Sequence, residues 1–180
     1  ADGIPLLYHD DHLKRISGKK GKLNQFHFDA LATLTAGEPG RFRQQFSDVR
    51  ITALSALVRI LQQHPAVQVL VELKEEAVRE YTAAFCLERI RETLAPVMDR
   101  CILISFDIDA LRVAKSTGYT RLGPVLRDWT MRHNVAKELD AEMVICNYQR
   151  IPARDSLFML HCAVAVYEID AIPLAQSLLD

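Results

Sequence analysis

The sequence predicts an α/β fold in which parallel strands alternate with helices. Short apolar runs alternate along the chain with segments whose apolar residues recur at helical spacing, which is typical of α/β proteins. Two of these runs, residues 4–7 and 69–71, lead directly into ionisable residues. A strand covered on both faces is almost continuously apolar, so polar residues at its carboxyl end indicate a site at that end of a barrel or open sheet.

The first third of the chain is expected to form one strand and two helices. Residues 4–7 form the strand, and the polar residues 17–22 form the loop that follows it. Residues 29–34 have the pattern of a short helix. Residues 47–63 carry their leucines and a valine on one face, which predicts a helix that leads into the next strand.

From residue 67 onward, strands and helices are expected to alternate five times. A strand over 67–73 is followed by a long amphipathic helix over 75–94. The remaining expected elements are, in order, strand 101–106, a helix through Leu111 and Val113, strand 120–125, helix 130–139, strand 142–147, helix 153–160, strand 163–169 and helix 174–179. Five such units are more than half of an eight-unit barrel, although a doubly wound sheet remains open on periodicity alone. The glycine-rich loops that hold nucleotides are absent from the sequence, so dinucleotide cofactors are not expected.

Composition indicates one globular domain and gives no sign of a nucleic-acid or membrane partner. The chain has 180 residues, of which 49% are apolar and 25% charged, and this is enough to bury a substantial core. The formal net charge of −1 gives no electrostatic reason to expect nucleic-acid binding. No apolar run approaches the roughly 20 residues that span a bilayer, so stable membrane insertion is not expected. A short basic cluster is interpreted as a solvated loop and consists of Lys14, Arg15, Lys19, Lys20 and Lys22.

The four cysteines predict a reducing environment. They lie far apart without C-x-x-C spacing, and three of them are in or beside apolar runs, so we expect buried thiols and no zinc site. The residues are Cys86, Cys101, Cys146 and Cys162. A cytoplasmic location is the resulting expectation.

Residues 2–15 read D-G-I-P-L-L-Y-H-D-D-H-L-K-R and resemble the D-G-x-P-V-V-x-H-D-x-x-L-x-R stretch of the glycerophosphodiester phosphodiesterase family. The later landmarks of that family, T-G, E-L-x-x-L, P-T-L, I-E-L-K and S-F, are matched in the same order by residues 17–18, 29–34, 51–54, 71–74 and 104–106. The resemblance covers essentially the whole chain. Its H-D-x-x-L-x-R and E-L-K elements are the most specific.

The resemblance implies a (β/α)8 TIM barrel of phosphodiesterase type, represented in this sequence by about five to six strands of a single domain over residues 1–180. It also implies hydrolysis of glycerophosphodiesters to glycerol 3-phosphate and an alcohol with a divalent metal, Ca2+ or Mg2+. By resemblance, His9 is the second of two catalytic histidines and Glu72 is a metal ligand. Lys74 is then a neighbour of the metal-bound phosphate, and Phe106 and Tyr167 line the pocket for the alcohol.

These residue types suit the implied chemistry. Imidazole can give a proton to a leaving alkoxide in one step and take a proton in another, because its pKa is near neutrality. A carboxylate is a hard oxygen ligand of the kind that calcium and magnesium prefer. Lys74 follows Glu72 by two residues, so both are expected on the same side of the strand.

Several landmarks of the family are absent from this sequence. They are the H-R-G strand, the P-E-N-T helix start, the E-x-D metal pair and the final G-x-D-x-I-x-T-D-x-P strand. An eight-unit barrel has about 250 residues, so about 70 residues are unaccounted for, which matches two strands at the start and one at the end. Residues 167–170 read Y-E-I-D where the family has W-T-V-N.

Other polar residues have simpler interpretations. Asn147 and Asp107 lie at strand ends, and neither is favoured over a structural residue as a ligand contact. The remaining histidines are interpreted as hydrogen-bonded structural residues, and they are His12, His27, His64, His133 and His161.

Two alternatives to an active phosphodiesterase remain open. In the first alternative, the chain is a catalytically inactive barrel remnant. Such a remnant binds a partner or a phosphate ligand, or associates with itself as a homo-oligomer that covers exposed strand edges. A weaker alternative is a barrel of the phosphatidylinositol-specific phospholipase type, against which the sequence lacks a basic or aromatic membrane-facing surface.

Overall fold

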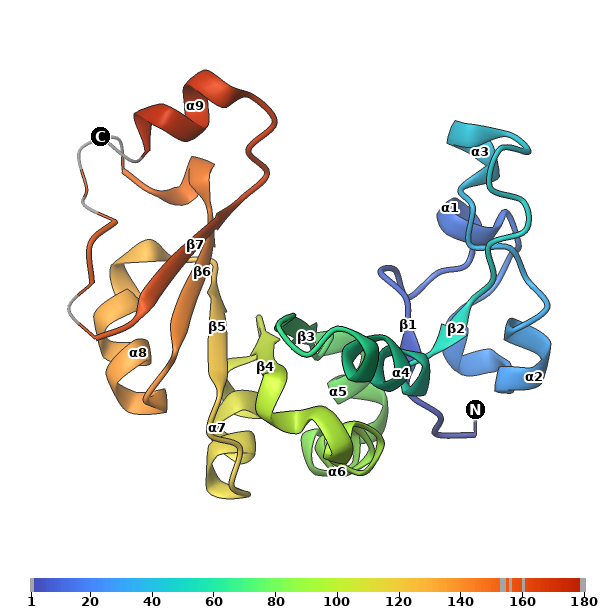
Figure 1. The fold of residues 1–180 in the computed structure, drawn as a ribbon, viewed down its shortest axis with the longest axis horizontal. Coiled ribbons are helices and arrows are strands. Elements are labelled where there is room, and N and C mark those ends of the chain that lie inside the picture. The colour runs from blue at the N-terminus through green and yellow to red at the C-terminus, as the bar shows by residue number, and fades with distance from the viewer. Residues whose placement is uncertain (1, 153–154, 156, 160, 179–180) are drawn as a thin grey trace. The chain divides into compact units, whose positions relative to one another are not determined.

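Five parallel strands form the main sheet of the molecule. The computed structural model describes residues 2–152, 155, 157–159 and 161–178. The sheet has the order β3-β4-β5-β6-β7, and Figure 1 shows these strands following one another in chain order. Their bounds are Val69–Glu72 for β3, Cys101–Ser105 for β4, Leu122–Leu126 for β5, Met143–Asn147 for β6 and Ala163–Tyr167 for β7. A doubly wound sheet reverses its strand order, so this sheet is a curled part of a barrel, which confirms the expected incomplete TIM barrel.

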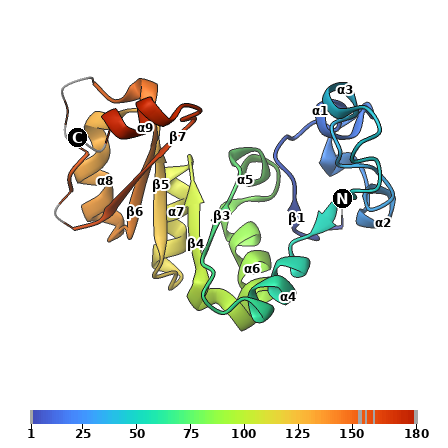
Figure 2. The same ribbon diagram turned by 45° about the horizontal axis from the view of Figure 1, so that its top comes forward.

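Helical segments join these strands. They are α5 (Glu75–Tyr81), α6 (Ala83–Leu94), η2 (Ala95–Arg100), α7 (Ile108–Ser116), η3 (Trp129–Met131), α8 (Arg132–Leu139), η4 (Tyr148–Arg150) and α9 (Ile172–Ser177). The helices α7 and α8 contact each other and pack against the middle strands, and Figure 2 shows them on one side of the sheet. Leu111 of α7 and Leu139 of α8 are fully buried in this packing. The core of the sheet is therefore formed between the strands and these two helices.

Gly123 allows β4, β5 and β6 to pack closely. A Cβ atom at this position would lie 3.0 Å from Ile104 Cγ2 and 3.2 Å from Met143 Cγ. Both contacts are tighter than ordinary van der Waals separation, so a larger residue at this second position of β5 would require the neighbouring side chains to shift.

The chain divides into two compact units. One contains the chain up to Val67 together with Leu87–Met98, and the other contains Gln68–Cys86 and the chain from Asp99 onward, which carries the parallel sheet. The elements before Val67 are β1 (Leu6–Leu7), α1 (Lys14–Ser17), η1 (Leu23–Gln25), α2 (Phe28–Leu31), α3 (Pro39–Phe42), β2 (Thr52–Ala53) and α4 (Ser55–Gln63). Their core is a cluster of Leu13, Leu31 and Ile51.

The prediction of a buried parallel strand over residues 4–7 is wrong. The strand β1 has two residues and pairs antiparallel with β2, and Leu7 is 43% exposed. Pro5 has no N–H to donate to a ladder, and its carbonyl accepts a hydrogen bond from Leu54 N at 2.8 Å. The apolar run therefore forms an extended segment of which only Leu6 and Leu7 pair with another strand, the two-residue β2.

Three predicted helices have different bounds in the structure. The helix predicted over 75–94 is divided at Thr82, whose φ of 77° lies in the left-handed region. The helix predicted over 47–63 begins at Ser55, because residues 52–53 form β2. The helix predicted over 29–34 ends at Leu31, since Leu34 N bonds to the Leu31 carbonyl in a tight turn.

The second half of the chain follows the predicted order more closely. The strand expected over 120–125 lies at β5, and the helix expected over 130–139 is preceded by the 3-10 turn η3. Strand β7 ends at Tyr167 because Glu168 adopts a φ of 63°. Of the helix predicted over 153–160, residues 153, 154, 156 and 160 lie outside the described residues, and residues 155 and 157–159 are not helical.

The expected burial of the cysteines is confirmed for three of them. Cys86, Cys101 and Cys146 are buried. Burial raises the pKa of each of these thiols. Among the residues that the structure describes, no helix has both the length and the apolar composition required to cross a membrane.

Candidate active site

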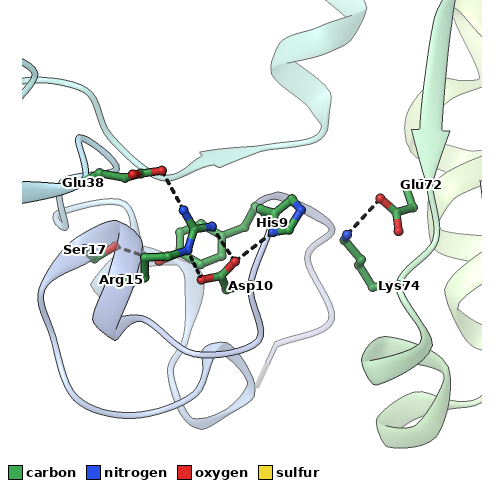
Figure 3. Close-up of polar contacts among 8 residues, drawn as sticks. His9, Asp10, Arg15, Ser17, Glu38, Glu72 and Lys74 are labelled. Atoms are coloured by element: carbon green, nitrogen blue, oxygen red, sulfur yellow. Dashed lines mark hydrogen bonds and ion pairs between the residues drawn. The ribbon is translucent and has the colours of Figure 1, made fainter. Parts of the chain in front are cut away.

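The first group of candidate residues lies directly after β1 and centres on His9. Figure 3 shows the imidazole of His9 facing the carboxylate of Asp10, and the distance from Nδ1 to Oδ1 is 2.8 Å. The His9 side chain is 74% exposed, so packing against neighbours does not fix its position. The hydrogen bond to Asp10 therefore orients the ring.

Arg15 holds the Asp10 carboxylate from the opposite side. Its Nε donates to Oδ2 at 2.7 Å and its Nη2 donates to Oδ1 at 2.6 Å, which is a bidentate pair. Its remaining nitrogen Nη1 donates to Glu38 Oε1 at 2.7 Å (Figure 3). Leu13 and Ile16 are buried on either side of Arg15, so α1 is anchored while the guanidinium reaches outward.

This pairing changes the interpretation of the basic cluster. Arg15 was expected to be part of a solvated loop, but it lies on the helix α1 and joins Asp10 to Glu38. Of the other cations in the cluster, Lys22 lies 3.3 Å from Asp11. A partner that follows Arg15 by 23 residues cannot be recognised from local spacing.

The ion pairs keep Asp10 charged. The hydrogen bonds from Arg15, with a smaller contribution from His9, lower the pKa of Asp10 to about 2. The same contact raises the pKa of Arg15 further above its usual range. Asp10 is therefore a carboxylate at neutral pH.

The second group lies at the carboxyl end of β3. Lys74 Nζ donates to Glu72 Oε2 at 2.8 Å, and both side chains are about one quarter exposed, at 28% and 27% (Figure 3). Leu73 between them is buried, as alternation along an extended chain requires. The expected placement of Glu72 and Lys74 on one side is therefore found, as an ion pair at a strand end.

Ser105 ties the end of β4 to the end of β3. Its side chain is fully buried, and its Oγ donates to the carbonyl of Leu73 at 2.7 Å. The same oxygen accepts a hydrogen bond from Asp107 N at 3.0 Å. Because Leu73 lies between Glu72 and Lys74, this contact holds the backbone that presents both side chains.

Phe106 directly follows β4 and stacks against Arg127. The guanidinium carbon of Arg127 lies 4.5 Å from the centre of the Phe106 ring. Arg127 also makes a bidentate pair with Glu75, with N–O distances of 2.9 and 2.6 Å. This pair lowers the pKa of Glu75, mainly through the hydrogen bonds from Arg127. Sequence reasoning missed both residues, because 52 positions separate the partners.

Tyr167 ends β7, where it is paired in register with Asn147. Partial burial raises the pKa of Tyr167, so its hydroxyl is neutral at physiological pH. The amide of Asn147 donates to Glu168 Oε2 at 2.9 Å and accepts from Gln149 N at 2.9 Å. Asn147 therefore supports the turn after β6, which is the simpler of its two interpretations.

Asp107 has a structural role as the residue that caps the N-terminus of α7. Its Oδ1 accepts a hydrogen bond from Ala110 N at 2.9 Å, which makes it the N-cap of α7. Of the histidines interpreted as structural, His12 and His27 lie 3.7 and 3.8 Å from the carboxylates of Asp11 and Asp2.

The described residues do not by themselves form a metal site. Within residues 2–152, 155, 157–159 and 161–178, no three His, Cys, Asp or Glu side chains are grouped so that they could hold an ion. Calcium takes six to eight oxygen ligands, and magnesium requires octahedral geometry. Glu72 supplies one carboxylate, and one of its oxygens is bonded to Lys74.

The sequence matches one protein family, and the structure resembles solved structures with the same fold. The sequence model of the glycerophosphoryl diester phosphodiesterase family matches residues 1–153. The structure resembles a phosphodiesterase of Oleispira antarctica, solved in complex with the product sn-glycerol-3-phosphate, with a TM-score of 0.78 and 20% identity. That match covers 98% of this chain and 72% of the other.

A second solved structure has the same fold. It is a glycerophosphodiester phosphodiesterase of Parabacteroides distasonis, which is 17% identical, with a TM-score of 0.68. The match covers 97% of this chain and 69% of the other. No curated protein matches the sequence.

Proposed function

The chain belongs to the glycerophosphoryl diester phosphodiesterase family, and we propose that it hydrolyses a glycerophosphodiester to glycerol 3-phosphate and an alcohol. The observation that carries this proposal is the family match over residues 1–153, which includes both candidate groups. The solved relative that holds sn-glycerol-3-phosphate supports the same class of small-molecule substrate. Residues 1–180 are proposed to act as one catalytic domain.

In this proposal His9 is the general acid and base. Hydrolysis of a phosphodiester breaks the bond between phosphorus and the alcohol oxygen, and that oxygen must gain a proton as it leaves. Water supplies the new oxygen on phosphorus and must lose a proton. An imidazole can perform both transfers in turn, and the exposed ring of His9 leaves one nitrogen accessible to a substrate.

Residues at the strand ends bind the substrate in this proposal. The ammonium of Lys74 offsets the negative charge of the phosphoryl group. Phe106 and Tyr167 provide the apolar walls against which the alcohol lies. The stack of Arg127 on Phe106 holds one of these walls in place.

Members of the family generally use a divalent metal, and we assign Glu72 as one ligand of a calcium or magnesium ion. Such an ion supplies charge compensation for the phosphoryl oxygens. Glu72 alone does not satisfy the coordination of either ion, so the steps above are assigned only to side chains of this chain.

The protein is further proposed to be cytoplasmic, as its buried cysteines suit a reducing compartment. Its net charge of −1 makes nucleic acid an unsuitable partner, and a homo-oligomer is the macromolecular assembly that we propose.

Two substitutions test the division of roles. His9→Ala is expected to abolish the release of glycerol 3-phosphate from glycerophosphocholine and to leave metal affinity unchanged, because the imidazole moves protons only. Glu72→Ala is expected to lose both activity and metal affinity, measured by calorimetric titration with calcium and with magnesium. His12→Ala, which removes another exposed histidine, is the control. Equal loss of metal binding in the His9 and Glu72 variants would refute this assignment.

A further inference from the structure

We infer that Asp10, held by Arg15, is a positioning residue that fixes His9 in the tautomer with its proton on Nδ1, so that Nε2 exchanges protons with the substrate. The inference rests on the proposed role of His9. It concerns two residues to which the sequence assigned no part in the reaction.

The tautomer follows from the charge of Asp10. An ionised carboxylate only accepts hydrogen bonds, so the hydrogen between Asp10 Oδ1 and His9 Nδ1 belongs to the histidine. The neutral ring then has its lone pair on Nε2, at the opposite side of the imidazole. That nitrogen accepts the proton of water or, once charged, gives a proton to the leaving alcohol.

Arg15 determines where the carboxylate can lie. It donates to both oxygens of Asp10 at 2.7 and 2.6 Å, which fixes the plane of the carboxylate, and it is itself tied to Glu38 at 2.7 Å. A single point charge would neutralise Asp10 without fixing this plane. His9 Nδ1 therefore donates to a carboxylate whose two oxygens are each already held by one Arg15 nitrogen.

The backbone that carries His9 and Asp10 is anchored on both sides. Before them, Tyr8 packs against the cluster around Leu13, and its hydroxyl lies 3.0 Å from Ser17 Oγ. After them, Leu13 N donates to the carbonyl of Gly21 at 3.0 Å. Because the imidazole is 74% exposed and the backbone is held, the Asp10 contact is the element that selects the ring orientation.

Nitrogen-15 NMR of the histidine-labelled protein tests the tautomer without requiring activity. For the neutral form of the ring, reached by raising the pH until the His9 signal no longer changes, we expect the signal of an imidazole protonated at Nδ1. The His9→Gln variant assigns the signal. In Asp10→Asn the signal is expected to move toward the Nε2–H form, whereas in the neighbouring Asp11→Asn it should not move.

Kinetics test the positioning. Asp10→Asn is expected to lower kcat about 10- to 100-fold, by analogy with carboxylates that orient a metal-bound imidazole through its second nitrogen. KM should change by less than about two-fold, because the substrate is not contacted. Arg15→Lys keeps the charge but loses the two parallel hydrogen bonds to Asp10, so its kcat is expected to lie between those of the wild type and Arg15→Met. The control variant Asp11→Asn is expected to keep the wild-type kcat.

The outcomes separate the two proposals. A wild-type His9 protonated at Nε2, or an Asp10→Asn protein with unchanged tautomer and kcat, would overturn the inference. A wild-type His9 protonated at Nδ1 in a protein that releases no glycerol 3-phosphate would support the tautomer assignment and overturn the proposed function.

Discussion

Ser105 is a single buried hydroxyl on which the geometry of a strand end depends. Replacing it with alanine leaves the Leu73 carbonyl and the Asp107 amide without the partner that they share. We expect Ser105→Ala to lower the free energy of unfolding by about 1–3 kcal/mol, measured by urea denaturation. Ser116→Ala, on the exposed last turn of α7, should change it by less than about 0.5 kcal/mol. Equal effects of the two changes would show that the Ser105 contact is unimportant.

The ion pair of Asp10 and Arg15 gives stability a defined dependence on pH. The folded-state pKa of Asp10 is about 2, below its usual value of 3.8, so its contribution is complete above about pH 4 and is lost as pH falls toward 2. Arg15 is half exposed, so solvent screens part of this contribution.

Asp10→Asn should therefore be less stable than the wild type at pH 6, and the difference should vanish near pH 2. Thermal unfolding of both proteins across this range measures the difference. A difference that stays constant from pH 6 to pH 2 would contradict the assignment of the shift to this pair.

Side chains that lie together were predictable where the two residues are close in sequence. Glu72 and Lys74 are two positions apart and were expected on one side of the strand, and the structure shows them as a hydrogen-bonded pair. Longer pairs were not predictable, because an ion pair such as Glu75 with Arg127 depends on which strands become neighbours. The sequence pattern alone does not show that Glu75 and Arg127 lie close together, because the order of the strands in the sheet must be known first.

The break between α5 and α6 is the least expected feature among the elements. Thr82 has a φ of 77° and a ψ of 150°, a region in which glycine is favoured and a β-branched residue is strained. We expect Thr82→Gly to raise the free energy of unfolding by about 1 kcal/mol.

The control for this change is Glu88→Gly in the middle of α6, which should lower the free energy of unfolding by about 1 kcal/mol. Chemical denaturation of the two variants gives both values. Destabilisation of similar size in both would mean that residues 75–94 form a continuous helix in solution.

Elements were predicted best where the apolar pattern was long. The four strands β4 to β7 were found near their predicted places, and β5 forms although Pro124 lies within it. The segment at residues 4–7 was misassigned, because a run of apolar residues does not reveal whether its backbone has partners. Boundaries at left-handed residues such as Thr82 and Glu168 could not be foreseen, since neither is the usual residue type for that conformation.

At the scale of the molecule, the parallel sheet has two edges. Within the described residues, β3 and β7 each pair with one strand, and Leu70 on β3 is 46% exposed. Unpaired edges favour association with another strand. We therefore expect the protein to self-associate at micromolar concentration, measured by light scattering after size exclusion. A monomer over the whole concentration range would count against the proposed homo-oligomer.

The central claim is that this chain cleaves glycerophosphodiesters with His9 as its acid and base. The most direct test is the release of glycerol 3-phosphate from glycerophosphocholine by the purified protein with calcium or magnesium, compared with its His9→Ala variant. We predict release by the wild type and a loss of at least about 100-fold in the variant, as expected for a general acid and base. No release by a folded wild type, or equal release by the two proteins, would contradict the claim.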